Sequence, residues 1–311
     1  MIITLTLNPA IDKTVEVKAL KPGELVRVNS VREDAGGKGI NVSKTIHALN
    51  SKSAAMGFLG KENPSIFEKC FWNYSIENGF LFVSGSTRTN IKITEPDGRL
   101  TELNEPGFII SKADQERLLE QVYRRADKYT LFVLSGSLPK GADPDLYAKI
   151  IIRIHNKGGS VILDTDQEGF AQAMEQGPAI VKPNLHEMME YNHLDHEPQQ
   201  KELIQLGRKM LEKGPEMICI SAGGMGAMLV TKEHAYRGFP PHVIVRSSVG
   251  AGDAMVAALA VARERKLSEV EAFRMAVAVS AGACETEGTQ PPEKERIKKL
   301  LEDTSIKEIN M

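Results

Sequence analysis

The turn Ser247-Ser-Val-Gly-Ala-Gly-Asp253 carries the strongest chemical signal in the sequence. Its glycines allow successive backbone N–H groups to face one point, and the apolar helix predicted to follow adds unpaired amides and a partial positive charge. The amides of Gly250, Ala251 and Gly252 are therefore candidate donors to an oxyanion. Asp253 could be only a helix cap, worth about 1 kcal/mol. Because the helix behind it is built from small apolar residues and must be buried, we favour Asp253 as a general base.

Two further glycine-rich turns could bind oxygen-rich ligands. The turn Ala35-Gly-Gly-Lys-Gly-Ile-Asn41 leads into helical periodicity, where Lys38 would add a positive charge and Asn41 offers both a donor and an acceptor. Tight packing of a strand against a helix would also explain this turn. The turn Ser221-Ala-Gly-Gly-Met-Gly226 could pass close to a nucleotide phosphate, or be only a hairpin turn into residues 227–231.

A sheet must position these turns, and the sequence predicts one. Short runs of β-branched and apolar residues recur along the chain with helical segments between most of them, which indicates a mostly parallel sheet covered by helices on both faces. Such sheets bind ligands beyond the carboxyl ends of their strands. The predicted strands are Ile2–Leu7, Ser53–Phe58, Thr130–Leu134, Val161–Leu163, Ala179–Val181 and Met217–Ile220.

Two stretches, Val15–Val31 and Thr87–Leu103, break this alternation. Each has strand-like sequence around a turn signal, Lys21-Pro-Gly23 or Pro96-Asp-Gly98, and neither is flanked by a helix of its own. They could be decorative edge strands. We favour a small four-stranded sheet that acts as a lid, because such a sheet needs a partner surface to bury one face.

The composition limits the classes of function. The 311 residues are 41% hydrophobic with a net charge of −2, which offers no basic field for a nucleic acid or an anionic membrane. Three scattered cysteines and a non-basic N-terminus predict a reducing cytoplasm, without export or a membrane anchor. No Gly-x-x-x-x-Gly-Lys-Ser/Thr loop occurs, and no Gly-x-Gly-x-x-Gly follows the first strand, which argues against P-loop NTPases and typical dinucleotide-binding dehydrogenases.

Six motifs in order resemble the ribokinase-like carbohydrate kinases of phosphofructokinase B type. The resemblance implies a Rossmann-like three-layer α/β sandwich with a mostly parallel sheet, formed by residues 1–11, 35–86 and 105–311. Residues 12–34 and 87–104 would form a β-sheet lid, which often makes the contact of a homodimer. The motifs are Thr6-Leu-Asn-Pro-Ala-Ile-Asp12, Gly36-Gly-Lys-Gly-Ile-Asn-Val42, Thr87-Arg-Thr-Asn-Ile-Lys-Ile93, Ser135-Gly-Ser-Leu-Pro139, Val181-Lys-Pro-Asn-Leu-His-Glu187 and Val249-Gly-Ala-Gly-Asp253.

The resemblance also implies ATP and Mg²⁺ as cofactors and a set of site residues. Asp253 would accept a proton from a sugar hydroxyl, and Asp12 would hold sugar hydroxyls. Asn184 and Glu187 would organise Mg²⁺ through water, and the same spacing is a helix capping box, a compatible role. The other substrate-side positions are Gly36, Gly37, Lys38, Asn41, Arg88, Asn90, Lys92, Asn104 and Ser137. The nucleotide-side positions are Lys182, Asn184, Ser221, Gly223, Gly224, Gly226, Ser248 and Gly282.

Within the family the chain looks most similar to the kinases of fructose 1-phosphate and tagatose 6-phosphate. Lys38 and Arg88 are cations suited to a sugar phosphate, although Arg88 could be a solvated charge on the lid. Asn90, Lys92 and Asn104 favour fructose 1-phosphate. Another sugar or nucleoside kinase, or a non-catalytic sugar-phosphate sensor, remains as an alternative. An intact base and metal motif argue against the sensor, since binding alone needs neither.

Three segments depart from the family pattern or receive no role. Ala222 stands where relatives usually carry a larger apolar residue, which could alter the nucleotide pocket slightly. Lys61-Glu-Asn-Pro64 follows Gly57-Phe-Leu-Gly60 in place of the common acidic residue, which puts substrate contacts of that loop in doubt. The acidic strand end Leu163-Asp-Thr-Asp166 resembles one in the family, but we assign it no function.

Overall fold

A sheet with a long parallel section forms the centre of the protein in the computed structural model, which describes residues 1–165 and 167–309. All six predicted strands are present, and they lie side by side in parallel. A further parallel strand and an antiparallel section complete ten strands among the described residues. In spatial order these are β14 (Ser305–Glu308), β13 (Ala235–Phe239), β12 (Ala227–Thr231), β11 (Met217–Ser221), β10 (Ile180–Val181), β9 (Ser160–Asp164), β8 (Leu131–Ser135), β1 (Ile2–Thr6), β4 (Ser53–Gly60) and β5 (Glu77–Val83).

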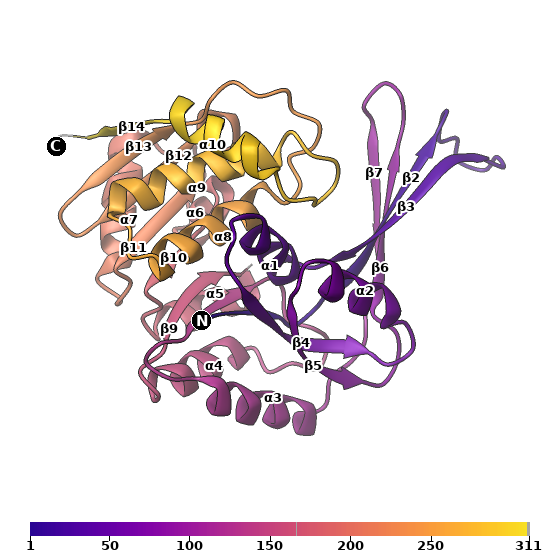
Figure 1. Ribbon diagram of the computed structural model, residues 1–311, viewed down its shortest axis with the longest axis horizontal. Helices are drawn as coiled ribbons and strands as arrows, with labels where there is room; N and C mark the ends of the chain where they lie inside the picture. The colour runs from indigo at the N-terminus through magenta and orange to yellow at the C-terminus, as the bar shows by residue number, and fades with distance from the viewer. Residues whose placement is uncertain (166, 310–311) are drawn as a thin grey trace.

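Helices cover both faces of this sheet (Figure 1). Successive side chains of a strand point to opposite faces, so an unbroken apolar strand serves two cores. Phe132 and Leu134 of β8 pack in the core beneath α3 to α7, while Leu131 and Val133 pack with α1, α8, α9 and α10. The helices are α1 (Lys38–Ala48), α2 (Ser65–Asn73), α3 (Lys112–Arg125), α4 (Leu146–His155), α5 (Gln167–Met174), α6 (Leu185–Tyr191), α7 (Gln200–Leu211), α8 (Ala251–Glu264), α9 (Glu269–Ala283) and α10 (Lys294–Asp303).

A separate four-stranded sheet projects from this body (Figure 1), as the two irregular stretches predicted. Each stretch folds as an antiparallel pair, and the two pairs join through parallel strands β2 and β6. The three-layer α/β architecture with a small second sheet is confirmed. The strands reach two residues beyond the predicted lid segment 12–34 at each end. In spatial order they are β3 (Val28–Gly36), β2 (Ala10–Val17), β6 (Arg88–Thr94) and β7 (Leu100–Asn104).

Two of the glycine-rich turns begin helices, and the third joins two strands. Residues 223–225 form a single 3₁₀ turn between β11 and β12, which pair antiparallel, so this turn is a hairpin connection, one of its two predicted roles. The helix after Gly250 is buried along nearly its whole length, because its Ala, Val and Leu side chains meet α1, α9 and the sheet. Among the described residues, no helix is both long and apolar enough to cross a membrane.

Candidate active site

A cavity of about 1120 Å³ opens beyond the carboxyl ends of the parallel strands and extends to the small sheet. The ends of successive strands contribute Thr6, Gly136, Asp164, Lys182 and Ser221 to its wall. The β1, β8, β9, β10 and β11 strands end at the same edge because they run parallel. The cavity therefore lies where the sequence predicted the chemistry.

Glycine conformation lets the backbone line this cavity at two helix starts. Gly250 has a φ of 84°, in the left-handed region, and directly precedes α8. Gly37 has a φ of 115°, and a β-carbon there would lie 2.7 Å from Cγ2 of Thr6. Residues other than glycine are therefore disfavoured at these two positions. The turn from Gly250 to Gly252 lines the cavity at the N-terminus of α8, an arrangement suited to binding an anion.

Asp253 lies in the first turn of α8 with only 8% of its surface exposed. Nδ2 of Asn41 donates a hydrogen bond of 2.9 Å to its Oδ2. Burial raises the pKa of Asp253 to about 7, and the nearby Asp164 carboxylate adds to this effect. The hydrogen bond from Asn41 and the charges of Lys38 and Lys182 act in the opposite direction. A carboxylate with a pKa near neutrality is well matched to general-base catalysis.

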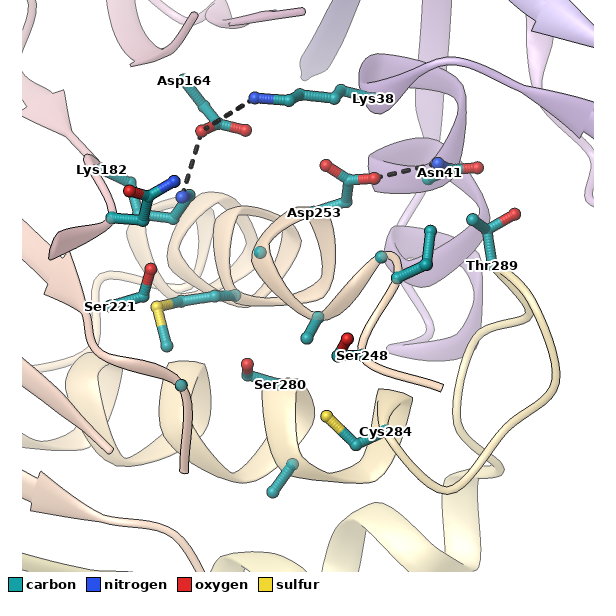
Figure 2. Close-up of a pocket in the computed structure, with 18 of the residues that line it drawn as sticks. Lys38, Asn41, Asp164, Lys182, Ser221, Ser248, Asp253, Ser280, Cys284 and Thr289 are labelled. Atoms are coloured by element: carbon teal, nitrogen blue, oxygen red, sulfur yellow. Dashed lines mark hydrogen bonds and ion pairs between the residues drawn. The ribbon is translucent and has the colours of Figure 1, made fainter. Parts of the chain in front are cut away.

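Asp164, at the end of β9, holds two cations at the same site (Figure 2). Its Oδ1 lies 3.1 Å from Nζ of the buried Lys182 and 3.8 Å from Nζ of Lys38. Burial acts to raise the pKa of Asp164, but Lys182 and Lys38 together hold that pKa below its usual range. For Lys182, burial acts to lower the pKa, but Asp164 makes the net shift upward. The two ammonium groups therefore lie at the cavity wall, where they can meet phosphate oxygens.

No local sequence pattern assigns a function to Asp164. Its position at the end of a buried strand was a signal, but its partners come from α1 and from the segment after β10. Only the fold brings them together. Asp166, the last residue of the same acidic strand end, lies outside the described residues.

The small sheet contributes polar and cationic groups to the other end of the cavity. Asp12 on β2 pairs in register with Asn90 on β6, and Nζ of Lys92 lies 3.8 Å from Oδ1 of Asp12. The guanidinium of Arg88 donates to the backbone oxygens of Asn8 and Pro9, at 3.3 and 3.4 Å. Arg88 is thus anchored at the cavity wall, which favours ligand binding over a solvated lid charge.

Ser137 and Asn8 lie at the same end of the cavity as Arg88. Nδ2 of Asn8 donates to Oγ of Ser137 at 3.2 Å, while its Oδ1 is buried and has no hydrogen-bond partner among the residues that the structure describes. Ser137 is among the predicted site residues and Asn8 is not, although Asn8 belongs to the first of the six motifs. Its contact with Ser137 spans 129 residues of sequence and could not be inferred from local pattern.

The opposite end of the cavity has the residues predicted for the nucleotide. Asn184 and Glu187 form the predicted capping box at α6, with hydrogen bonds of 2.8 and 2.7 Å between side chain and backbone. Both also line the cavity, so the two predicted roles are compatible in space. The remaining members that line it here are Lys182, Ser221, Gly223, Gly224, Gly226 and Ser248.

These residues fit a magnesium ion that keeps much of its water. Glu187, Asn184 and Asp164 offer hard oxygen donors at the cavity wall. Among residues 1–165 and 167–309, no cluster of three acidic, histidine or cysteine side chains is placed to enclose a metal. An ion held here would therefore need water and ligand phosphates to complete its coordination, as Mg²⁺ commonly does.

Three predicted positions do not line the cavity. Gly282 lies within α9 and faces α10, where an added β-carbon would be 2.9 Å from Cδ1 of Leu300, so it serves helix packing. Asn104 is an exposed residue at the end of β7. Gly36 supports the site indirectly, since a β-carbon there would lie 2.4 Å from Oδ2 of Asp12.

Further side chains, which the sequence does not predict as site residues, complete the lining of the cavity. Ser280 and Cys284 lie on the α9 side of it, below the α8 turn in Figure 2. Met255 and residues of the segment 240–245 add apolar surface. These residues carry no motif, and only the fold brings them to the cavity. They are Pro240, Pro241, His242, Val243, Val245, Met255, Val277, Ser280, Ala281, Cys284 and Thr289.

Comparison with known proteins agrees with this geometry. Residues 5–296 match the model of the pfkB family carbohydrate kinases. The chain is 34% identical over 280 residues to 1-phosphofructokinase of Escherichia coli K12, covering 90% of this chain and 89% of that protein. It is 37% identical over 287 residues to 1-phosphofructokinase of Xanthomonas campestris pv. campestris, covering 89% of each. The crystal structure of E. coli phosphofructokinase-2 in complex with substrates and products superposes with a TM-score of 0.91 at 26% identity, covering 97% of this chain and 98% of that one.

Proposed function

The chain belongs to the pfkB family of carbohydrate kinases, phosphotransferases with an alcohol acceptor, and we propose that it phosphorylates fructose 1-phosphate with ATP. The product is fructose 1,6-bisphosphate. The observation that carries this proposal is the buried Asp253, with its raised pKa, beside the Gly250–Gly252 turn in a cavity that also contains cations. Two relatives named 1-phosphofructokinase support the choice of acceptor.

The proposed reaction uses groups at the centre of the cavity. Asp253 accepts the proton of the 6-hydroxyl as that oxygen attacks the γ-phosphorus of ATP in line, and the bond to ADP breaks. The amides of residues 250–252 donate to the oxygens of the transferring group. Lys182 and Lys38, held by Asp164, stabilise the same negative charge. Asn184 and Glu187 would hold Mg²⁺ through water, and the ion would supply neutralisation of nucleotide phosphate charge.

The acceptor's existing phosphate is proposed to bind at the end of the cavity beside the small sheet. Arg88 is the principal cation there, and Asp12 with Asn90 holds the sugar hydroxyls. Lys38 is also predicted from the sequence to bind this phosphate. Because its ammonium pairs with Asp164 and acts on the pKa of Asp253, we propose that Lys38 also contacts the transferring group.

The small sheet is proposed to close over the acceptor and to contribute a homodimer contact. Closure would exclude water and so prevent wasteful hydrolysis of ATP. Apolar side chains stand on this sheet and its connecting loop with about half or more of their surface exposed, which favours burial against a second copy. They are Leu25, Val28, Val31, Leu100 and Leu103. An ATP-dependent kinase with three unpaired thiols also fits the reducing cytoplasm.

Tagatose 6-phosphate is the alternative acceptor. Both compounds are ketohexose phosphates, and cationic and hydroxyl-binding groups of the kinds present here would suit either. The mechanism at Asp253 would be unchanged, and the product would be tagatose 1,6-bisphosphate. A neutral sugar or nucleoside acceptor is disfavoured by the anchored Arg88.

A coupled ADP-release assay tests the proposal. The acceptors to compare by kcat/KM are fructose 1-phosphate, tagatose 6-phosphate, fructose 6-phosphate and fructose. We expect fructose 1-phosphate to lead. A lead for tagatose 6-phosphate would establish the alternative, and a lead for fructose would contradict phosphate recognition. No ADP release with any acceptor would contradict the proposed kinase activity on these substrates and return attention to a sensor or another acceptor.

A further inference from the structure

Lys44 is a buried cation behind the active site. It lies on α1 with 2% of its surface exposed, and the reaction described above does not use it. A buried ammonium is costly unless its protons are hydrogen-bonded. Nζ of Lys44 donates to the backbone oxygen of Ala35 at 2.5 Å and to Oδ1 of Asn41 at 3.3 Å. Its position therefore depends on the residues that lead into the active-site helix.

The contact with Asn41 decides which way the amide of that residue faces. An amide side chain has an oxygen that accepts and a nitrogen that donates, whereas an ammonium can only donate. Lys44 therefore requires Oδ1 of Asn41 on its own side, and Nδ2 is left to donate to Oδ2 of Asp253 at 2.9 Å. The reversed amide would place its oxygen against the carboxylate and its N–H groups against the ammonium. Both contacts would then be repulsive.

We propose that Lys44 is a positioning residue that locks the amide of Asn41 so that it donates to Asp253. The hydrogen bond stabilises the ionised carboxylate and directs the side chain that is proposed to act as the base. The inference rests on the proposed function insofar as Asp253 is the base, but the orientation of Asn41 is a property of the protein itself. Lys44 touches neither the cavity nor the reacting atoms.

The charged groups around this chain of contacts come from several elements. Burial raises the pKa of the Cys70 thiol, the charge of Lys44 acts to lower that pKa, and the carboxylate of Asp34 acts to raise it. Around Asp253, the neighbouring carboxylate of Asp164 raises its pKa, and Lys38 and Lys182 lower it. A neutral residue at position 44 leaves these other groups in place. A change in the titration of Asp253 would then report on the loss of Lys44, and an Asn41→Ala background separates the loss of its contact with Asn41 from the loss of its charge.

The test is the pH profile of kcat for wild type and Lys44→Met, each alone and in an Asn41→Ala background. We expect Lys44→Met to move the acid limb upward by about 0.5–1 pH unit, because it weakens a hydrogen bond to the charged form of Asp253. At pH values below the acid limb, kcat of Lys44→Met should be about 3- to 10-fold lower than that of wild type. The KM values of the two proteins for the acceptor should agree within about 3-fold. In the Asn41→Ala background, Lys44→Met should add no further shift if it acts through the amide. Lys44→Arg, which retains donors, should restore most of the wild-type profile.

Matched variants separate this effect from a general loss of stability. Ser43→Ala removes a neighbouring buried group on α1 that bonds to Thr4 and Ser53, and we expect it to lower Tm without moving the limb. If Lys44→Met does not fold, Lys44→Gln replaces it with a smaller expected shift in the same direction. An unmoved limb in the folded variant would overturn the inference. If Lys44→Met moved the acid limb by the full amount in the Asn41→Ala background, that result would also overturn the inference.

A direct titration makes the result independent of kinase activity. The ¹³C signal of the Asp253 carboxyl, assigned by its loss in Asp253→Asn, should titrate at a higher pH in Lys44→Met than in wild type. This holds even if the proposed reaction proves wrong, since no substrate is involved. Equal titration of the two proteins would overturn the role of Lys44. Failure of the proposed function would appear separately, as the absence of ADP release by wild type.

Discussion

The hydrogen bond from Asn41 to Asp253 joins the first turns of α1 and α8 across 212 residues of sequence. It ties the helix that follows the Gly36-Gly37 turn to the helix that follows the Gly250–Gly252 turn. The two turns therefore face one cavity in a fixed relation. Asn41 is predicted to contact hydroxyls of the substrate, and it lines the cavity. Its donor nitrogen also reaches the proposed base, which makes it a residue that orients Asp253.

Replacing Asp253 by Asn should abolish turnover without loss of the fold. The amide is nearly the same size but cannot accept the proton, so we expect kcat to fall by at least about 100-fold. In wild type, kcat should rise through a pH near 7, where the carboxyl becomes ionised. Steady-state kinetics from pH 5.5 to 8.5 check both points. Near-normal turnover by Asp253→Asn would rule out this residue as the base.

The same variant should be more stable than wild type at alkaline pH. The pKa of Asp253 is raised from 3.8 to about 7 in the folded protein, so the folded state keeps a proton that the unfolded chain loses. The stabilising contribution is complete below about pH 4 and is lost as the pH rises through 7. The free energy of unfolding of Asp253→Asn at pH 8 should thus exceed that of wild type by on the order of 3–4 kcal/mol.

Urea unfolding of the two proteins at pH 4, 6 and 8 measures this difference. The difference in the free energy of unfolding should shrink towards pH 4, where the side chain at position 253 is neutral in both folded proteins. Asp97→Asn is the matched control, because Asp97 is exposed and its pKa is lowered, chiefly by a hydrogen bond from the backbone of Arg99. A gap independent of pH would show that burial does not perturb Asp253 as described.

Removal of Arg88 should weaken binding of the acceptor's phosphate. Loss of a charge-assisted contact predicts an increase of about 10- to 100-fold in KM for fructose 1-phosphate in Arg88→Ala, with KM for ATP nearly unchanged. Arg99→Ala is the control in the turn between β6 and β7, since Arg99 is largely exposed and pairs with Glu95 and Asp97. Equal KM values in wild type and Arg88→Ala would contradict the assignment.

Two glycine substitutions should separate the anion-binding turn from helix packing. Gly250→Ala forces a side chain into a left-handed conformation, at a cost of about 1–2 kcal/mol, and should lower kcat by disturbing the turn. Gly282→Ala should lower Tm through contact with Leu300 and leave KM for ATP within about 2-fold. A large increase in KM for ATP in Gly282→Ala would restore its predicted nucleotide role.

Glu187→Gln should raise the Mg²⁺ requirement while preserving α6. Gln at this position maintains a capping box, so the helix start remains satisfied, but the negative charge is lost. We expect the Mg²⁺ concentration for half-maximal activity to increase about 10-fold, the loss of one charged ligand interaction. Circular dichroism verifies the fold, and a magnesium titration at fixed ATP gives the result. An unchanged titration would leave Glu187 with the capping role alone.

The local pattern of the sequence was sufficient for the elements and for the backbone turns. Apolar strands, helical periodicity and glycine spacing depend on neighbours along the chain, which is why all six predicted strands and the small sheet are present. The base candidate Asp253 could be identified for the same reason, since its turn and its buried helix are contiguous. The capping box at Asn184 and Glu187 is equally local.

Tertiary structure decided everything that depends on groups distant in sequence. The role of Asp164 appears only when parallel strands bring Lys182 beside it and α1 brings Lys38. Gly282 was predicted to contact the nucleotide, but the packing of α10 turns its open side toward Leu300. The pKa of Asp253 is likewise set by burial and by carboxylate and ammonium groups on other elements. Sequence determines which chemical groups are available, whereas the electrostatic field that makes one of them reactive exists only after folding, because charges act through space.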